Sequence, residues 1–185
     1  PNMTVLAPKN DRELEEMLAF AVSFDGPIAI RYPRGSAHQG LQEYQAPVEY
    51  GRSEIIRKGK KIAVLGVGSM IPSCMEICKG LKDDGYDPTF VNVRFVKPLD
   101  VDLLDELAKD HSLFVTVEEN VKSGGYGEHV SAYMEACHPE IRVLSAAVWD
   151  RFVPQGNVES LRSRIGLGVE DIRQAIEDSE ELREQ

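Results

Sequence analysis

Residues 61–69, KIAVLGVGS, form a short apolar run that ends in a glycine-containing turn. Similar apolar runs follow at 89–93, 113–117 and 142–148, and amphipathic helical patterns separate them at 71–82, 101–109 and 129–137. Short buried strands that alternate with such helices are typical of a parallel sheet covered on both faces. With further helices near 157–164 and 169–182, the pattern predicts a doubly wound, mostly parallel α/β domain over residues 61–185.

A second, smaller unit is predicted upstream, over residues 1–36. An apolar run at 4–7 precedes Asn10, a good helix N-cap with Glu13 three residues later, and an amphipathic helix then extends to about residue 25. The apolar run 27–31 follows as a strand. We interpret this strand-helix-strand unit as the C-terminal remnant of another α/β domain, joined by a linker at 37–60.

The first residues also indicate a fragment. The chain opens on Pro1 without an initiator methionine and enters an apolar segment at once, so we expect a piece of a longer protein. The sequence leaves open why it starts there, whether residues 1–36 fold stably alone, and the oligomeric state.

Composition excludes several classes of protein. Asp and Glu number 31 against 21 Lys and Arg, and a net charge of -10 disfavours nucleic acid as a partner. We expect no membrane association, since no stretch approaches the roughly 20 apolar residues that span a bilayer, and no signal peptide is evident. Three cysteines without a signal peptide favour a reducing cytoplasm. Cys74 and Cys78 share an apolar helix face, which favours core packing over zinc binding.

Several motifs could carry chemistry, but each also has a structural interpretation. Gly66-x-Gly68 follows a strand, yet the dinucleotide fingerprint lacks its third glycine, so a tight turn is favoured. The amides of the glycine-rich run 124–127 could hold an anion or simply allow close helix packing. Glu118 and Glu119 are expected on opposite sides of a strand end, where they cannot share a substrate. The four histidines show no metal or catalytic spacing.

The segment 31–35, RYPRG, differs from these motifs. Two guanidinium groups leave the end of a parallel strand, a proline stiffens the turn and a glycine permits close backbone approach. The arrangement suits a phosphate or carboxylate. An interdomain ion pair for Arg31 or Arg34 is the alternative.

Five stretches together resemble the C-terminal third of the 1-deoxy-D-xylulose-5-phosphate synthase family. They are RYPRG at 31–35, KIAVLG at 61–66, VRFVKPLD at 93–100, TVEEN at 116–120 with the glycines after it, and PQG at 154–156. The resemblance implies a remnant of the pyrimidine-binding domain at 1–36 and a transketolase C-terminal-like domain at 61–185. Transketolases and 2-oxoacid dehydrogenase beta subunits share the fold but not these sequence motifs.

The resemblance implies a transferase that condenses pyruvate and glyceraldehyde 3-phosphate to 1-deoxy-D-xylulose 5-phosphate with loss of CO2, in isoprenoid and thiamine biosynthesis. It implies thiamine diphosphate and Mg²⁺ in the full-length parent, bound upstream of Pro1, and neither cofactor bound to this chain. It assigns Arg34 to binding of the acceptor's phosphate. It assigns no residue of this chain to catalysis, cofactor binding or metal binding. The chain alone is therefore expected to be inactive and to support a homodimer with the rest of its own polypeptide.

Two alternatives remain open at the level of sequence. One is the tail of a transketolase or of a 2-oxoacid dehydrogenase beta subunit. The other is an independent nucleotide- or effector-binding module that uses the loops at the carboxyl ends of the strands.

Overall fold

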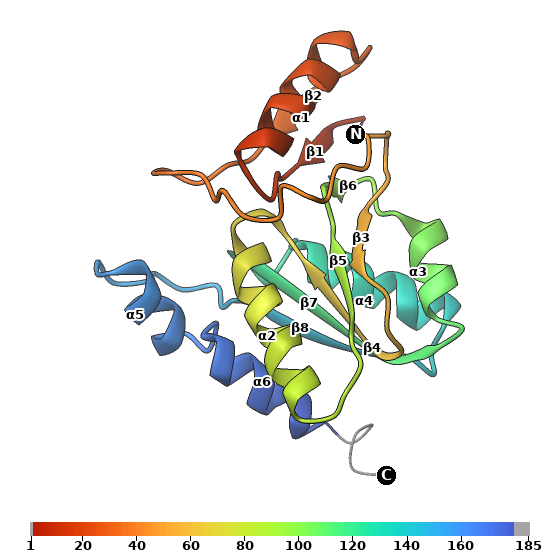
Figure 1. The fold of residues 1–185 in the computed structure, drawn as a ribbon, viewed down its shortest axis with the longest axis vertical. Coiled ribbons are helices and arrows are strands. Elements are labelled where there is room, and N and C mark those ends of the chain that lie inside the picture. The colour runs from red at the N-terminus through yellow and green to blue at the C-terminus, as the bar shows by residue number, and fades with distance from the viewer. Residues whose placement is uncertain (1, 180–185) are drawn as a thin grey trace.

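The computed structural model describes residues 2–179 and contains the predicted α/β domain (Figure 1). Its five-stranded sheet has the order β3-β5-β4-β7-β8. Strands β4, β5, β7 and β8 are parallel, and β3 is an antiparallel edge strand. The strands are β3 (Glu54–Arg57), β4 (Lys61–Gly66), β5 (Thr89–Asn92), β7 (His111–Val121) and β8 (Arg142–Val148).

Helices cover both faces of this sheet, as the doubly wound prediction requires. Helices α2 (Ile71–Asp83) and α6 (Val169–Glu177) pack on one face, and α3 (Val101–Leu107) and α4 (Tyr126–Cys137) on the other (Figure 1). Neighbouring β4 residues divide between the two cores: Val64 packs with α2 and Leu65 with α4. A continuous apolar strand is needed because each face is buried.

Two helices near the C-terminus complete the chain. Helix α5 (Val158–Arg164) lies away from the sheet, and α6 packs against α2 (Figure 1). The helix predicted over 169–182 ends at Glu177. Positions 180–182 of that prediction lie outside the described residues.

The upstream unit has the predicted strand-helix-strand order. It consists of β1 (Thr4–Leu6), α1 (Asp11–Ser23) and β2 (Ile28–Ile30), with β1 parallel to β2. Asn10 caps α1 by accepting a hydrogen bond from the Glu13 amide at 2.9 Å. The unit is joined to the rest of the chain by an element that the sequence did not predict. Strand β6 (Phe95–Lys97) pairs antiparallel with β1, and Phe95 packs against Leu6 and Met17.

The predicted linker at 37–60 is partly wrong. Residues 54–57 form β3, whose residues alternate between buried and half-buried. The signal in the sequence was weak because one of its two buried residues is the charged Glu54.

Within residues 2–179, no helix is long and apolar enough to cross a membrane.

Candidate functional site

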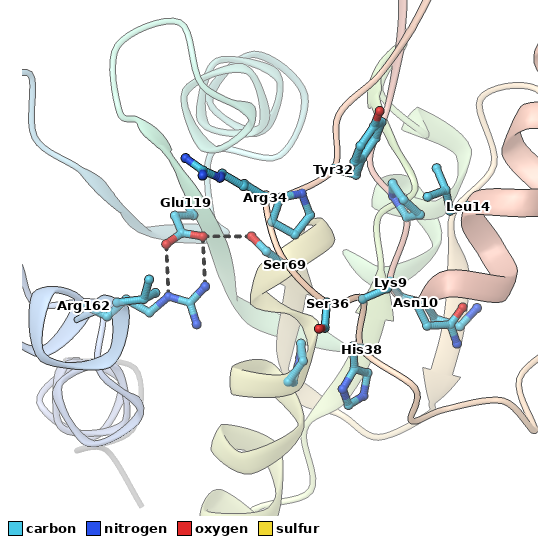
Figure 2. Close-up of a pocket in the computed structure, with 15 residues that line it drawn as sticks. Lys9, Asn10, Leu14, Tyr32, Arg34, Ser36, His38, Ser69, Glu119 and Arg162 are labelled. Atoms are coloured by element: carbon cyan, nitrogen blue, oxygen red, sulfur yellow. Dashed lines mark hydrogen bonds and ion pairs between the residues drawn. The ribbon is translucent and has the colours of Figure 1, made fainter. Parts of the chain in front are cut away.

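The main candidate site is a cavity of about 540 Å³ where the upstream unit meets the carboxyl ends of β4 and β7 (Figure 2). Ligands of open α/β sheets commonly bind at this edge. The turn that follows β2 forms one wall, and α5 with the end of β7 forms the other. Its polar lining residues are Lys9, Asn10, Tyr32, Arg34, Ser36, His38, Ser69, Glu119 and Arg162.

Arg34 lies on the turn wall of this cavity, and its side chain is exposed. It makes no ion pair with any residue that the structure describes. Arg31 is also exposed and lines a neighbouring cavity of about 200 Å³ that shares Ser69 and Glu119. The interdomain ion pair considered for one of these arginines is therefore not seen within residues 2–179, and Arg34 is available to an anion.

Glu119 and Arg162 form the opposite wall. Two guanidinium nitrogens of Arg162 donate to the Glu119 carboxylate at 3.2 and 2.9 Å, and the Ser69 hydroxyl donates to it at 3.0 Å (Figure 2). Partial burial alone would raise the pKa of Glu119, but the bonds from Arg162 and Ser69 outweigh it and lower the pKa. Glu119 is therefore an ionised group whose charge Arg162 balances.

Glu118 points the other way, as predicted from strand geometry. Its carboxylate is fully buried and accepts hydrogen bonds from the amides of Tyr126 at 3.0 Å and Gly127 at 2.8 Å. These amides begin α4, where the helix dipole favours a negative charge. The anion held by the glycine-rich loop is thus a side chain of the same protein, and the loop offers no open phosphate site.

The Gly66-x-Gly68 turn is filled by packing. A Cβ at Gly66 would lie 2.8 Å from Cys74 Sγ, and one at Gly68 would lie 3.0 Å from Ala7 Cβ. Gly68 also has φ +50°. The two glycines allow α2 and the upstream unit to approach the strand, which supports the tight-turn interpretation.

A buried ionic network lies beside the cavity and joins the two units. Arg94 donates to Glu13 at 2.7 Å, and its guanidinium lies 3.1 Å from Glu54. Lys9 contacts the same two carboxylates at 2.9 and 2.8 Å. Arg94, Glu13 and Glu54 come from three separate segments, and Arg94 adopts the left-handed region at φ 57°. The interdomain ion pair that sequence reasoning sought at Arg31 or Arg34 is made by Arg94.

The other candidate groups are structural. Cys74 and Cys78 are buried residues of α2 that pack in the core, and burial raises the pKa of Cys78 to about 12. Among residues 2–179, no group of three or more His, Cys, Asp and Glu side chains is arranged to hold a metal ion.

His111 is buried and contacts Thr89, whereas His138 contacts Asp105. His38 alone lines the cavity, and its Nε2 is buried without a partner among the described residues.

Sequence reasoning missed most of this site. In the sequence, Ser69 is 50 residues from Glu119, and Glu119 is 43 residues from Arg162. No local motif connects these three residues. The rule that ligands bind at strand carboxyl ends pointed to Ser69 and Glu119, but no signal indicated that α5 returns to that edge.

The fold is that of the C-terminal domain of transketolases. Residues 51–172 match the family model of the transketolase C-terminal domain, and the chain belongs to that family. Relatives that are similar to this chain over most of its length are 1-deoxy-D-xylulose-5-phosphate synthases. The synthase of Lachnoclostridium phytofermentans is 42% identical over 173 residues, and that of Nitrosomonas europaea is 40% identical over 179 residues. The resemblance stated from the sequence motifs is therefore confirmed.

These alignments cover 93% and 96% of this chain but 28% of each relative. The chain thus spans little more than a quarter of the relatives' length. A solved structure described as a split gene transketolase, inactive beta4 tetramer, superposes with a TM-score of 0.90 at 27% identity, covering 99% of this chain and 59% of the other. A Campylobacter jejuni transketolase, with TM-score 0.67 and 16% identity over 97% of this chain and 26% of its own, shows the shared fold.

Proposed function

We propose that this chain serves as the C-terminal part of a 1-deoxy-D-xylulose-5-phosphate synthase and is inactive without the rest of that enzyme. The identity of 36–42% to synthases over nearly the whole chain carries this proposal. The reaction joins a two-carbon unit of pyruvate to the aldehyde carbon of glyceraldehyde 3-phosphate, and the pyruvate carboxylate leaves as CO2. Assay of this chain alone with both substrates should give no product, and activity should appear only with the cofactor-binding part.

Thiamine diphosphate would supply the carbanion-stabilising chemistry of this reaction, with Mg²⁺ holding its diphosphate. The described residues do not fit either group. The glycine-rich loop before α4 already holds Glu118, and the Gly66-x-Gly68 turn is filled by Cys74 and Ala7. We therefore assign both cofactors to other parts of the synthase.

Arg34 is our candidate for the acceptor's phosphate. It is a guanidinium without an ion-pair partner among the described residues, it lines a cavity large enough for a triose phosphate, and it lies at the carboxyl edge of β2. Proline before it and Gly35 at φ +116° after it shape the turn that presents it.

Substitution of this arginine tests the assignment. A charge-assisted contact contributes about 1.5–3 kcal/mol, so Arg34→Ala in the assembled synthase should raise the KM for glyceraldehyde 3-phosphate about 10- to 100-fold. The KM for pyruvate should stay nearly unchanged, because pyruvate carries no phosphate. Arg12→Ala, which removes an exposed charge on α1 that does not line this cavity, is the matched control. An equal loss for both substrates would contradict the assignment.

The remaining expectations concern partners and location. We propose that the synthase is a cytoplasmic homodimer in which the domain at 61–185 has a mainly architectural role. The oligomeric solved structure similar to this chain supports self-association. The net charge of -10 supports the absence of nucleic acid partners.

A transketolase is the second candidate, and the TM-score of 0.90 to a split gene transketolase favours it. The two-carbon donor separates the two enzymes. With pyruvate as donor and glyceraldehyde 3-phosphate as acceptor, the assembled synthase should release CO2, whereas a transketolase would transfer a ketol unit from a ketose phosphate and release none.

A further inference from the structure

Helix α5 is attached to the molecule in an unusual way. Residues 149–160 are all exposed, and α5 contains no buried residue. Figure 1 shows it standing away from the sheet at the end of a long connection. Even so, Val158 and Arg162 of this helix line the Arg34 cavity. An element without a buried side chain therefore forms one wall of the candidate site.

Two contacts hold α5 in this position. Downstream, Leu167 is buried in the core beneath α2, and the partly buried Ile165 packs with it. On the cavity side, the side-chain polar contact that α5 makes with the rest of residues 2–179 is the ion pair between Arg162 and Glu119. The Ser69 hydroxyl also donates a hydrogen bond to Glu119. The helix is thus fixed at its C-terminal end and held over the cavity by one ion pair.

That ion pair is suited to opening and closing. Glu119 and Arg162 retain 35% and 23% of their side-chain exposure, and partly exposed pairs of this kind are weak. In Figure 2, Arg34 and Arg162 lie on either side of Glu119 in the view. Opening of α5 would therefore both widen the cavity and leave the Glu119 carboxylate unbalanced beside the anion site.

We propose that α5 is a flap over the Arg34 cavity and that the Arg162–Glu119 ion pair keeps it closed on a bound phosphorylated ligand. The identity of the ligand rests on the proposed function; the movement of the flap does not. A closed flap slows ligand escape, so Arg162 and Glu119 act as positioning residues for the acceptor.

Hydrogen–deuterium exchange of the 185-residue chain tests the flap without any ligand. Glu119→Gln and Arg162→Gln should each speed exchange of amides in 149–164 by about two- to fivefold, the range expected for loss of a partly exposed pair. The charge swap, Glu119→Arg with Arg162→Glu, should return exchange toward the native rate. Arg164→Gln removes a charge from the same helix that has no partner among the described residues, and it is the matched control. Native exchange rates in both single variants would overturn the flap.

Kinetics of the assembled synthase then separate a flap from simple charge effects. Glu119→Gln removes a negative charge near Arg34, which by itself would lower the KM for glyceraldehyde 3-phosphate. Loss of flap closure instead raises that KM, by about two- to fivefold, and leaves the KM for pyruvate unchanged. A lowered KM in Glu119→Gln would overturn the positioning role.

The two proposals can fail independently. If Arg34→Ala has no effect on the acceptor KM while the single variants still speed exchange, the phosphate assignment falls and the flap stands. If exchange over 149–164 does not respond, the flap falls whatever Arg34→Ala does.

Discussion

Glu118 and Glu119 show how two identical neighbours acquire different roles at the end of one strand. Successive strand residues point to opposite faces. Glu118 therefore enters the core beside the first amides of α4, whereas Glu119 meets solvent, Ser69 and Arg162. Burial determines how much the contacts of each carboxylate contribute to stability. A buried carboxylate depends on its hydrogen-bond donors, whereas an exposed one can exchange them for water.

We predict a large difference in stability between the two truncations. Glu118→Ala leaves the amides of Tyr126 and Gly127 buried without their acceptor, and should lower the free energy of unfolding by about 3 kcal/mol. Glu119→Ala should cost less than about 1 kcal/mol. Urea unfolding followed by circular dichroism measures both, and equal losses would contradict this account of the α4 N-terminus.

At the scale of elements, the network around Arg94 explains why the two units form one body. Helix α1 contributes Glu13, β3 contributes Glu54, and the segment between β5 and β6 contributes Arg94. All three side chains are nearly inaccessible to solvent. Removal of one member of such a network leaves an uncompensated buried charge.

The network should make stability depend on acid pH. Burial alone would raise the pKa of Glu13, but the charges of Lys9 and Arg94 outweigh it and hold the pKa below its ordinary value of 4.5. Because the folded pKa is the lower one, the stabilisation is present above pH 4.5 and is lost as pH falls through the folded pKa. Unfolding free energies measured from pH 7 to pH 3 should show this fall.

Glu13→Gln is the comparison. It should cost about 3–5 kcal/mol at neutral pH, since Lys9 and Arg94 lose a charged partner, and it should flatten part of the acid-dependent fall. Glu16→Gln, which alters a partly exposed carboxylate on the same helix, is the control. An unchanged pH profile in Glu13→Gln would assign the acid sensitivity to other groups.

At the scale of the whole molecule, the upstream unit presents apolar surface to solvent. Leu18 and Val22 on α1 are 50% and 90% exposed, and β2 pairs with β1 on one side only among the described strands. Exposed apolar helix faces and open strand edges are common sites of protein association. Under the proposed function, other parts of the synthase would cover this surface.

The chain alone should therefore self-associate. Multi-angle light scattering at about 100 µM should give a mass above that of the monomer, and Leu18→Ser with Val22→Ser should shift the equilibrium toward monomer because each buried side chain of this size contributes about 1.5–3 kcal/mol. Val101→Ser changes an exposed valine on α3, remote from α1, and should have little effect. A strict monomer of the native chain would contradict the prediction.

The sequence by itself determined the α/β class, the order of the parallel strands and the helices of the main sheet from residue 61 onward, and the resemblance to the synthases. It could do so because apolar periodicity and turn residues are local signals that a buried parallel sheet requires. It also separated Glu118 from Glu119, since strand geometry alternates side chains. The phosphate role of Arg34 remains a prediction.

Only the tertiary structure showed that β6 joins the upstream sheet, that Arg94 binds Glu13 across 81 residues of sequence, and that α5 returns to the Arg34 cavity. These contacts bring together segments far apart in the chain, and their polar partners carry no periodic pattern. Such pairings depend on which surfaces meet after the sheet has formed, and no local sequence signal contains that information.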